Sequence, residues 1–575
     1  MKTRFKMTAL ALFATAATLA DTVKIGDFTW KYTTSGVSAT INGVSPATGA
    51  IEIPSQIMVG DNTYIVRAVG AFAFNNQKDI TSVKIPDSVT HVKPYAFQNC
   101  RSLATVKMGT GVTRIDISTF NHCSGLKLFE VAGEHPVYTS VNGLLLSKDG
   151  KILVKGVNGN VTIPNTVTSI VDWAFSSCSK LMSINVSPGS ATYASANGLL
   201  LTKDGKTLVI GVNGDVTIPD GVTDIAEWAF KDREGLTHVT IPDSLANIGS
   251  KAFSRCTNLT SVTIPAGVKS IGWGAFEDCV SLKRVTIPGS VANIEGGIFA
   301  GCHALKDVAV ADNNANYTCV NGLLLSKDGR TLVAGVIESG GITIPDGVMS
   351  IGEGAFSSCG GLMRVTMPNS LRSIGNRAFS YCSSLKGVTI PDAVTTIGDE
   401  AFSGCRGLTS VIIPNSVTAI GDGAFSDCRG LMRVTMPNNL KSIGKRAFSH
   451  CSSLEGVTIP DSVTAIGDEA FSSCRELASV TIPKLVTRVG EFAFFDCVGL
   501  KYVTIGSSVT SLESFAFCNC SGLKHVTFMG NAPRLGREVF SVVPPDCTVQ
   551  VNRNSTGWDV DIPGKWQGMI IRYVP

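Results

Sequence analysis

The sequence predicts a mostly β repeat solenoid, in which parallel strands from about twenty successive coils stack on one another with short helical turns at most. Three observations lead to this fold class. One motif returns with a period of 23 residues, each copy contains an alternating apolar segment that ends at proline, and phenylalanine and cysteine recur at the same step. Repetition of this kind is typical of solenoids, whose units cannot fold alone.

The repeat is clearest where neighbouring copies are nearly identical. Leu259–Pro265, Leu282–Pro288 and Leu454–Pro460 all follow the pattern L-x-x-V-x-I-P. The full unit reads L-x-x-V-x-I-P-x-x-V-x-x-I-G-x-x-A-F-x-x-C-x-x. Its phenylalanines stand at 74, 97, 120, 175, 230, 253, 276, 299, 356, 379, 402, 425, 448, 471, 494 and 517.

Each position of the unit has a physical role. Val262 and Ile264 alternate with polar residues, as a half-buried strand requires. Pro265 has no N–H group, so it ends the strand and turns the chain. Ile271 lies in a second short extended segment, and Phe276 is expected to fill the coil from the opposite side. Because one coil cannot cover its own apolar edges, stability must come from stacking on its neighbours.

This pattern resembles the BspA-type leucine-rich repeat family of bacterial surface proteins, whose units have the form L-x-x-V-x-I-P…I-G-x-x-A-F-x-x-C. The resemblance covers residues 71–545. It implies a leucine-rich-repeat superhelix, and it implies a surface protein that binds components of a host or of neighbouring cells.

Three inserts interrupt the period, near residues 133–160, 188–215 and 311–341. They lengthen the phenylalanine spacing to 55, 55 and 57 residues, and each contains N-G-L-L-L-[ST]-K-D-G-[KR]. Asp-Gly between apolar segments favours a two-residue hairpin turn in which both residues have positive φ. We therefore expect a β-hairpin at each Asp-Gly.

The two ends of the chain differ from the repeats. Residues 1–20 have the pattern of a signal peptide, with Lys2, Arg4 and Lys6 before an apolar segment and with cleavage before Asp21. Residues 21–70 are expected to form an N-terminal β cap, and 546–575 a C-terminal cap. The mature chain is therefore expected to be exported, either secreted, periplasmic or associated with the cell surface, with no transmembrane segment.

Charge and motifs argue against several functions. Without the three cations of the signal peptide, 46 basic residues face 45 acidic ones, so nucleic acid is not an expected partner. The patterns H-E-x-x-H and G-x-S-x-G are absent, and Cys518-x-Cys520 lacks the second cysteine pair that a zinc site needs. We expect no enzyme activity, no cofactor and no metal.

Fourteen of the 17 cysteines lie on the repeat, and Cys319, Cys518 and Cys547 do not. We interpret the repeated cysteines as buried free thiols, because cysteine packs as a small hydrophobic residue. A disulfide framework is the alternative, since the distance between stacked coils also permits it.

Two further columns follow from stacking at a separation of 23 residues. Arg377 is expected to lie beside Glu400, and Arg446 beside Glu469. A column of threonines, which includes Thr366, Thr389 and Thr435, should line an exposed sheet face.

The candidate site lies two residues before the repeated phenylalanine, where the varied residue types imply an exposed position. Several copies have an aromatic residue there, and Trp273 stands one position earlier in its copy. One hypothesis is an exposed aromatic stripe that binds a partner, because tryptophan and tyrosine dominate interface hot spots. The other is that the rings pack under the inserts or cover the solenoid ends. The candidate stripe consists of Phe72, Tyr95, Trp173, Trp228 and Trp273.

The sequence therefore predicts a non-catalytic, exported protein for adhesion or protein recognition, with a protein or glycan ligand on host or neighbouring cells. Two alternatives remain: a carbohydrate-binding or scaffolding module, and a structural spacer in a surface layer. The spacer would explain why residues 361–406 nearly duplicate residues 430–475.

Overall fold

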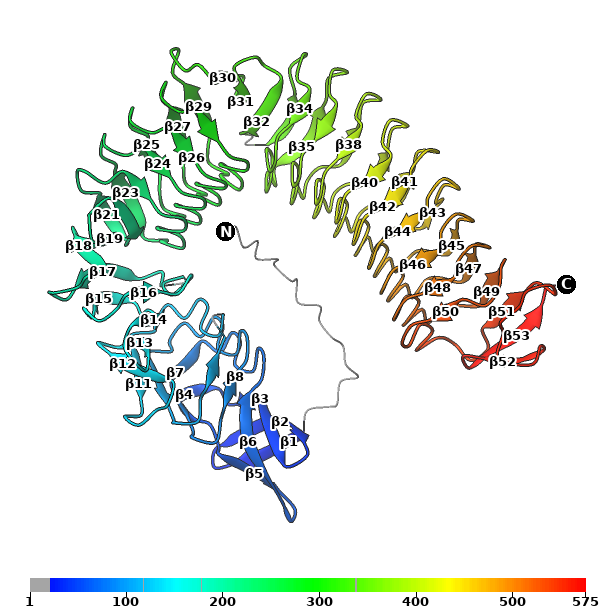
Figure 1. Ribbon diagram of the computed structural model, residues 1–575, viewed down its shortest axis with the longest axis horizontal. Coiled ribbons are helices and arrows are strands. Elements are labelled where there is room, and N and C mark those ends of the chain that lie inside the picture. The colour runs from blue at the N-terminus through cyan, green and yellow to red at the C-terminus, as the bar shows by residue number, and fades with distance from the viewer. Residues whose placement is uncertain (1–20, 117, 177, 337–338, 575) are drawn as a thin grey trace. The chain divides into compact units, whose positions relative to one another are not determined.

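The computed structural model describes residues 21–116, 118–176, 178–336 and 339–574, and every regular element in those ranges is a β-strand (Figure 1). The predicted fold class, a solenoid of stacked parallel strands, is confirmed. The predicted signal peptide lies outside the described residues. Two compact units are present, Met1–Gly205 with Ile210–Asn213, and Lys206–Val209 with Gly214–Pro575; they are called unit 1 and unit 2 below.

Each coil contributes one strand, usually of three or more residues, that ends near the proline of the repeat. In unit 1 these strands are β7 (Asp79–Ile85), β9 (Thr105–Met108), β11 (Leu128–Val131), β15 (Gly159–Ile163) and β17 (Leu181–Val186). In unit 2 they are β21 (Gly214–Thr217), β23 (Leu236–Thr240), β25 (Ser261–Thr263), β27 (Arg284–Ile287), β29 (Asp307–Val310), β33 (Gly340–Thr343), β35 (Leu362–Thr366), β37 (Gly387–Thr389), β39 (Ser410–Ile412), β41 (Arg433–Thr435), β43 (Gly456–Val457), β45 (Ser479–Ile482), β47 (Tyr502–Ile505) and β49 (His525–Phe528).

A second ladder consists of strands of only two residues. In unit 1 these are β8 (His91–Val92), β10 (Arg114–Ile115) and β16 (Ser169–Ile170). In unit 2 they are β22 (Asp224–Ile225), β24 (Asn247–Ile248), β26 (Ser270–Ile271), β28 (Asn293–Ile294), β34 (Ser350–Ile351), β36 (Ser373–Ile374), β38 (Thr396–Ile397), β40 (Ala419–Ile420), β42 (Ser442–Ile443), β44 (Ala465–Ile466), β46 (Arg488–Val489), β48 (Ser511–Leu512) and β50 (Arg534–Leu535).

Neighbouring strands in both ladders pair in parallel, and their register advances by one repeat. Val365 pairs with Val388, and Val388 pairs with Val411. Equivalent residues of successive coils therefore form straight columns. The predicted ion pairs follow from this register, with 2.8 Å between Arg377 Nε and Glu400 Oε2 and 2.7 Å between Arg446 Nη2 and Glu469 Oε1.

A third ladder runs through the loop that carries the repeated phenylalanine. The N–H of Phe379 donates to the carbonyl of Ala401 in the next coil at 2.7 Å, and Phe402 bonds to Ala424 in the same way. The residues two positions before and two positions after the phenylalanine have left-handed backbones, for example Glu400 with φ of 54°. Residues other than glycine rarely adopt this backbone conformation. We call these two columns the leading and trailing left-handed columns.

Stacked phenylalanine rings form the core inside the three ladders. The Phe402 ring lies 5.2 Å from that of Phe379 and 5.3 Å from that of Phe425, and its side chain is fully buried. The predicted inward position of this residue is therefore what the structure shows.

The repeated cysteines close the same core. All 17 cysteines are free thiols, as the first interpretation of them expected. The Sγ of Cys428 donates to the carbonyl of Phe402 one coil earlier, at 3.1 Å. Equivalent bonds run from Cys100, Cys123, Cys256, Cys279, Cys302, Cys382, Cys405, Cys451, Cys474, Cys497 and Cys520. Cysteine is favoured at this position because its small apolar side chain fills the space and satisfies a buried carbonyl group.

The inserts contain more strand structure than the Asp-Gly pattern predicts. The first forms a three-stranded antiparallel meander of β12 (Tyr138–Val141), β13 (Leu144–Ser147) and β14 (Ile152–Lys155), and the third does the same with β30 (Tyr317–Val320), β31 (Leu323–Ser326) and β32 (Thr331–Gly335). The second contains β18 (Tyr193–Ala196), β19 (Leu199–Thr202) and β20 (Thr207–Ile210).

The expected turn geometry belongs to Asn-Gly rather than Asp-Gly. Asn142 and Gly143 both have positive φ, 53° and 79°, as a two-residue hairpin turn requires. At the Asp-Gly turn only Gly150 has positive φ. The reason is that the Asp149 carboxylate accepts bonds from Ser147 Oγ at 2.6 Å and from the Lys151 N–H at 3.1 Å, which closes a longer loop.

Different strands close the solenoid at its two ends. At the N-terminal end these are β1 (Asp21–Ile25), β2 (Phe28–Ser35), β3 (Ser38–Ser45), β4 (Thr48–Glu52), β5 (Gln56–Val59) and β6 (Asn62–Val69), and Trp30 packs edge-on against Phe74 at 6.4 Å. At the C-terminal end β51 (Thr548–Val551), β53 (Met569–Tyr573) and β52 (Gly564–Trp566) extend the last sheet, and Trp566 lies 5.8 Å from Phe540. Both ends thus cover an otherwise open ring stack. Within the described residues there is no helix that could span a membrane.

Removing one ring should be costly. We expect Phe402→Ala to reduce the free energy of unfolding by about 3–5 kcal/mol, because it leaves a cavity between two rings. Thr389→Ala, on the exposed face of the same repeat, is the matched control and should cost less than about 1 kcal/mol. Urea denaturation followed by circular dichroism measures both. A loss of less than about 1 kcal/mol for Phe402→Ala would contradict the packing role of the ring stack.

The buried thiols predict a stability loss at alkaline pH. Burial raises the pKa of Cys100, Cys279 and Cys497 to about 12, from 9.0. Above pH 9 the folded state therefore retains protons that the unfolded state releases. The contribution of the buried thiols to the free energy of unfolding is complete below pH 9 and is lost as pH rises towards 12. Denaturation at pH 8, 9 and 10 should show the decline, with a limiting slope of about 1.4 kcal/mol per pH unit for each thiol in the cooperative unit. Cys279→Ala should have a shallower slope than the wild type, and equal slopes would contradict the assignment to thiols.

Candidate recognition surfaces

Four of the five candidate aromatic residues occupy the leading left-handed column, and Trp273 stands one position before it. Phe72 and Tyr95 have φ of 59° and 58° in unit 1, and their rings stack at 5.1 Å with an interplanar angle of 15°. Phe72 remains 44% exposed. The sequence analysis attributed the varied residue types of this column to exposure, but the backbone is the better reason. Glycine is the residue best suited to a left-handed conformation, and the glycines of this column, such as Gly274 and Gly354, stand at positive φ.

The remaining three residues are divided between the two units. Trp173 lies in unit 1 with φ of 70° and 43% of its surface exposed, whereas Trp228 lies in unit 2 with φ of 59° and is half-buried. Trp273 also belongs to unit 2. Three of the five residues of the candidate stripe therefore belong to unit 1 and two to unit 2.

Trp273 fills space that glycines leave in the column. The side-chain positions next to it belong to Gly274, Gly297 and Gly354, and a Cβ on Gly297 would stand 3.7 Å from the indole ring. Lys251 Nζ lies 4.5 Å from the ring centroid on one side, and Arg377 Cζ lies 6.0 Å away on the other. The tryptophan thus continues the column by packing between two cations, an arrangement that cation–π attraction stabilises.

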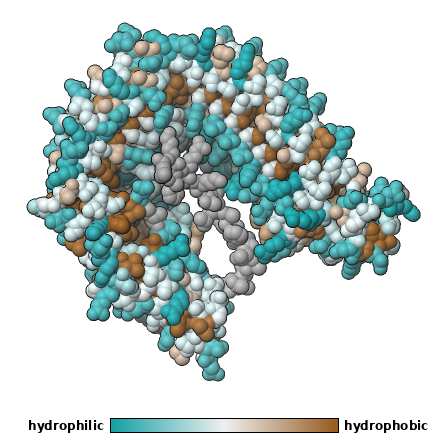
Figure 2. All heavy atoms as spheres, viewed as in Figure 1, coloured by the Kyte–Doolittle hydropathy of each residue, from teal (hydrophilic) through white to brown (hydrophobic). Residues whose placement is uncertain are grey.

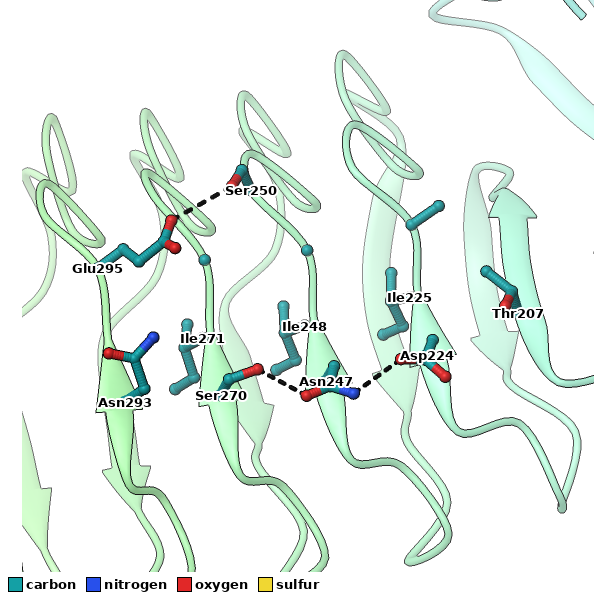
Figure 3. Close-up of a pocket in the computed structure, with 13 residues that line it drawn as sticks. Thr207, Asp224, Ile225, Asn247, Ile248, Ser250, Ser270, Ile271, Asn293 and Glu295 are labelled. Carbon is teal, nitrogen blue, oxygen red and sulfur yellow. Dashed lines mark hydrogen bonds between the residues drawn. The ribbon is translucent and has the colours of Figure 1, made fainter. Parts of the chain in front are cut away.

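A polar groove follows the two-residue strands of unit 2, and the sequence analysis did not identify it (Figure 3). It has a volume of about 430 Å³, and polar side chains from β22, β24, β26 and β28 line it. Asn247 Nδ2 donates to Asp224 Oδ1 at 2.8 Å, and Ser270 Oγ donates to Asn247 Oδ1 at 2.7 Å. These polar groups satisfy one another along the column, so the groove stabilises the coil stack without needing a ligand.

The exposed face of sheet β33–β35–β37–β39–β41–β43 has a different chemistry. Ile412 is 68% exposed, and Met363 and Met432 are 46% and 41% exposed. Ile412 pairs with Thr389 and Thr435, so it interrupts the predicted threonine column with an apolar side chain. On the side of the molecule drawn in Figure 2, hydrophobic residues reach the surface only in scattered areas between hydrophilic ones.

Two arginines flank this apolar area. Arg364 pairs with Gly341 in one neighbouring strand and with Gly387 in the other, so glycines stand on both sides of this arginine. Arg433 lies between Ser410 and Gly456. Within the described part of the chain neither guanidinium forms an ion pair, whereas Arg284, in the equivalent position of β27, binds Asp307 at 2.7 Å. We call Met363, Arg364, Ile412, Met432 and Arg433 the arginine–methionine face.

The repeat matches one family model over most of the chain. The model for the BspA type leucine rich repeat region, in six copies, covers residues 60–139, 158–197, 213–318, 337–455 and 441–545. The chain belongs to the BspA-type leucine-rich repeat family. This confirms the family resemblance of its repeats. A search of curated proteins found no match.

Three solved structures of bacterial leucine-rich repeat proteins are similar to this chain. A leucine rich cell surface protein from Faecalibacterium prausnitzii is 24% identical, with 89% of this chain and 95% of that chain covered and a TM-score of 0.28. Leucine-rich repeat proteins from Eubacterium ventriosum and Bacteroides ovatus are 20% and 22% identical. The matches cover 87% and 88% of this chain and 93% and 94% of those chains, with TM-scores of 0.37 and 0.24.

The ring stack of Phe72 and Tyr95 predicts a measurable coupling between the two residues. Phe72→Ala and Tyr95→Ala should each reduce the stability of unit 1, and the double variant should lose less than the sum of the two. Aromatic pairs contribute about 0.5–1.5 kcal/mol beyond area burial, and that is the expected coupling energy. Urea denaturation of the four proteins measures it. Strict additivity would show that these rings do not stabilise each other and would favour a role in partner binding.

Proposed function

We propose that this protein is a non-catalytic, exported surface protein that mediates adhesion by binding a partner protein through the arginine–methionine face. One observation carries the proposal: large apolar side chains lie exposed on a rigid sheet, between two arginines without carboxylate partners. Methionine and arginine are enriched at protein interfaces.

The energetics favour a protein partner on this face. If a partner buried Ile412 fully, the transfer of this side chain out of water would contribute on the order of 1.5–3 kcal/mol to the binding free energy. Arg364 and Arg433 would add charge complementarity, which increases the association rate and excludes basic partners. The partner is therefore expected to present an apolar patch bordered by carboxylates.

The duplicated block supports recognition over a purely structural spacer. Residues 361–406 and 430–475 each present one methionine next to one arginine, so the same pair appears twice on one sheet. Parallel strands are about 4.8 Å apart, which places Arg364 and Arg433 about 14 Å apart across three rungs.

Similarity to surface proteins supports the location. One solved relative is titled a leucine rich cell surface protein, and another is the pneumococcal vaccine antigen PcpA. Export through the signal peptide at residues 1–20 is part of the same proposal, as are the caps at 21–70 and 546–575 around the repeat region 71–545. The aromatic residues Phe72, Tyr95, Trp173, Trp228 and Trp273 remain a second candidate contact.

Binding to a panel of purified extracellular-matrix proteins and to intact epithelial cells tests the proposal. The variant Met363→Thr/Ile412→Thr/Met432→Thr removes the apolar side chains but keeps residues suited to strands. It should bind at least tenfold more weakly with an unchanged melting temperature. Thr458→Ser/Thr481→Ser, further along the same threonine column, is the matched control and should bind like the wild type.

Protease treatment of the cells supplies the second arm. Trypsin should abolish binding of the wild-type protein, because the expected partner is a protein. Equal binding of the wild type and the triple variant, or binding that survives trypsin, would contradict the proposal.

A further inference from the structure

Tyr381 is an exposed aromatic residue in the trailing left-handed column of unit 2. Its φ is 59°, and 57% of its surface is exposed, more than for any of the candidate stripe residues. The equivalent residue of the next coil is Gly404, and a Cβ there would stand 2.7 Å from Tyr381 Cδ1 and 3.1 Å from Cε1. The ring therefore rests on the glycine backbone, which holds it in one orientation and leaves it exposed to solvent.

A polar cluster lies in the next two coils after Tyr381. Arg406 follows Gly404 by two residues, and its Nη2 and Nε donate to Asp427 Oδ2 at 2.8 and 3.1 Å. Arg429 Nε donates to Asp427 Oδ1 at 2.7 Å. Both arginine side chains stay more than half exposed, so they retain donors for a ligand. Together the four residues combine a flat apolar surface with fixed planar donors and an acceptor.

The duplicated block shows that the ring and its glycine change together. Residues 361–406 and 430–475 differ at eight of 46 positions, and two of these are Tyr381, which becomes His450, and Gly404, which becomes Ser473. The arginine–aspartate pair is retained, because Arg475 donates to Asp496 at 2.9 and 3.1 Å, but Val498 stands where the first copy has Arg429. The second copy therefore keeps the arginine–aspartate pair without the aromatic surface.

We propose that Tyr381, Arg406, Asp427 and Arg429 form a glycan-binding site in which one pyranose ring stacks on Tyr381. The C–H face of a pyranose is apolar and packs on an aromatic ring, while its hydroxyl groups need hydrogen bonds. Arg406 and Arg429 donate to these hydroxyl groups, and Asp427 accepts from them. Ligand sites generally combine aromatic surface with a few placed polar groups in this way.

The surroundings fit a sugar better than a protein. A stable protein interface buries about 800 Å² on each partner around an apolar core. Around Tyr381 the neighbours are polar: Ser358 stands in the same column one coil earlier, and Ser383 and Ser384 follow in the chain. A single apolar ring among hydroxyl and charged groups matches one sugar ring in size. This site is independent of the arginine–methionine face.

A glycan array followed by isothermal titration with the strongest oligosaccharide of the array tests the proposal. The wild-type protein should bind one oligosaccharide per chain. Tyr381→Ala should weaken binding at least tenfold, and Tyr381→Phe, which keeps the ring face, should weaken it less than threefold. No ligand on the array, or unchanged binding by Tyr381→Ala, would overturn the proposal.

The natural duplication provides the reciprocal experiment. Tyr381→His/Gly404→Ser converts the first copy into the second and should abolish binding with an unchanged melting temperature, because His450 and Ser473 already occupy these positions in a folded coil. His450→Tyr/Ser473→Gly/Val498→Arg rebuilds all four residues in the second copy, so it should create a second site and raise the stoichiometry from one to two. A stoichiometry that stays at one would overturn the assignment to this ring and glycine.

The glycan site and the arginine–methionine face can be tested independently with different variants. Met363→Thr/Ile412→Thr/Met432→Thr should retain full oligosaccharide affinity, and Tyr381→His/Gly404→Ser should retain binding to the protein partner. Loss of both activities in either variant would contradict the independence of the two sites.

Discussion

The structure depends on register-matched stacking of coils around columns of stacked phenylalanine rings. At a typical step the backbone N–H of a phenylalanine bonds to the carbonyl of the residue before the next phenylalanine, usually an alanine, and the ring packs on the next ring at about the same spacing. Hydrogen bonding and apolar burial therefore require the same repeat length. A coil that is one residue longer would break both, so extra residues are accommodated as complete three-stranded inserts.

Stacking also constrains the exposed surface. Since equivalent positions form columns, any side chain is adjacent to its counterparts one coil away. In many columns the polar side chains form hydrogen bonds with one another, as Asp224, Asn247 and Ser270 do along the polar groove. The distinctive surfaces arise where a column is interrupted. Ile412 breaks the threonine column, Trp273 covers positions held by glycine, and Tyr381 rests on Gly404.

The left-handed columns explain why such interruptions concentrate in the phenylalanine loop. A position with positive φ tolerates glycine best, and a glycine leaves a gap of one side chain in a stacked column. A neighbouring aromatic residue can then lie across that gap. This single rule accounts for Trp273 over Gly297 and for Tyr381 over Gly404, although one ring packs between cations and the other faces solvent.

The sequence alone determined the coil. The period of 23 residues predicts the stacking register, the parallel strands, the buried Phe402 and the thiol column, because each of these follows from local pattern and from the need of a coil to cover its edges. It also placed Arg377 beside Glu400. These features require only that equivalent positions of successive coils lie next to each other.

Only the tertiary structure decided which surfaces are distinctive. Backbone handedness is invisible in the residue pattern, so the leading column was interpreted as exposed when its varied residues share a left-handed conformation. The Asn-Gly turns were missed because the apolar residues after them are continuous, and Tyr381 was missed because its column is as varied as any other. A tyrosine followed 23 residues later by glycine was the available signal, but its meaning depends on the ring lying across that glycine, which is a contact between coils and not a property of either residue.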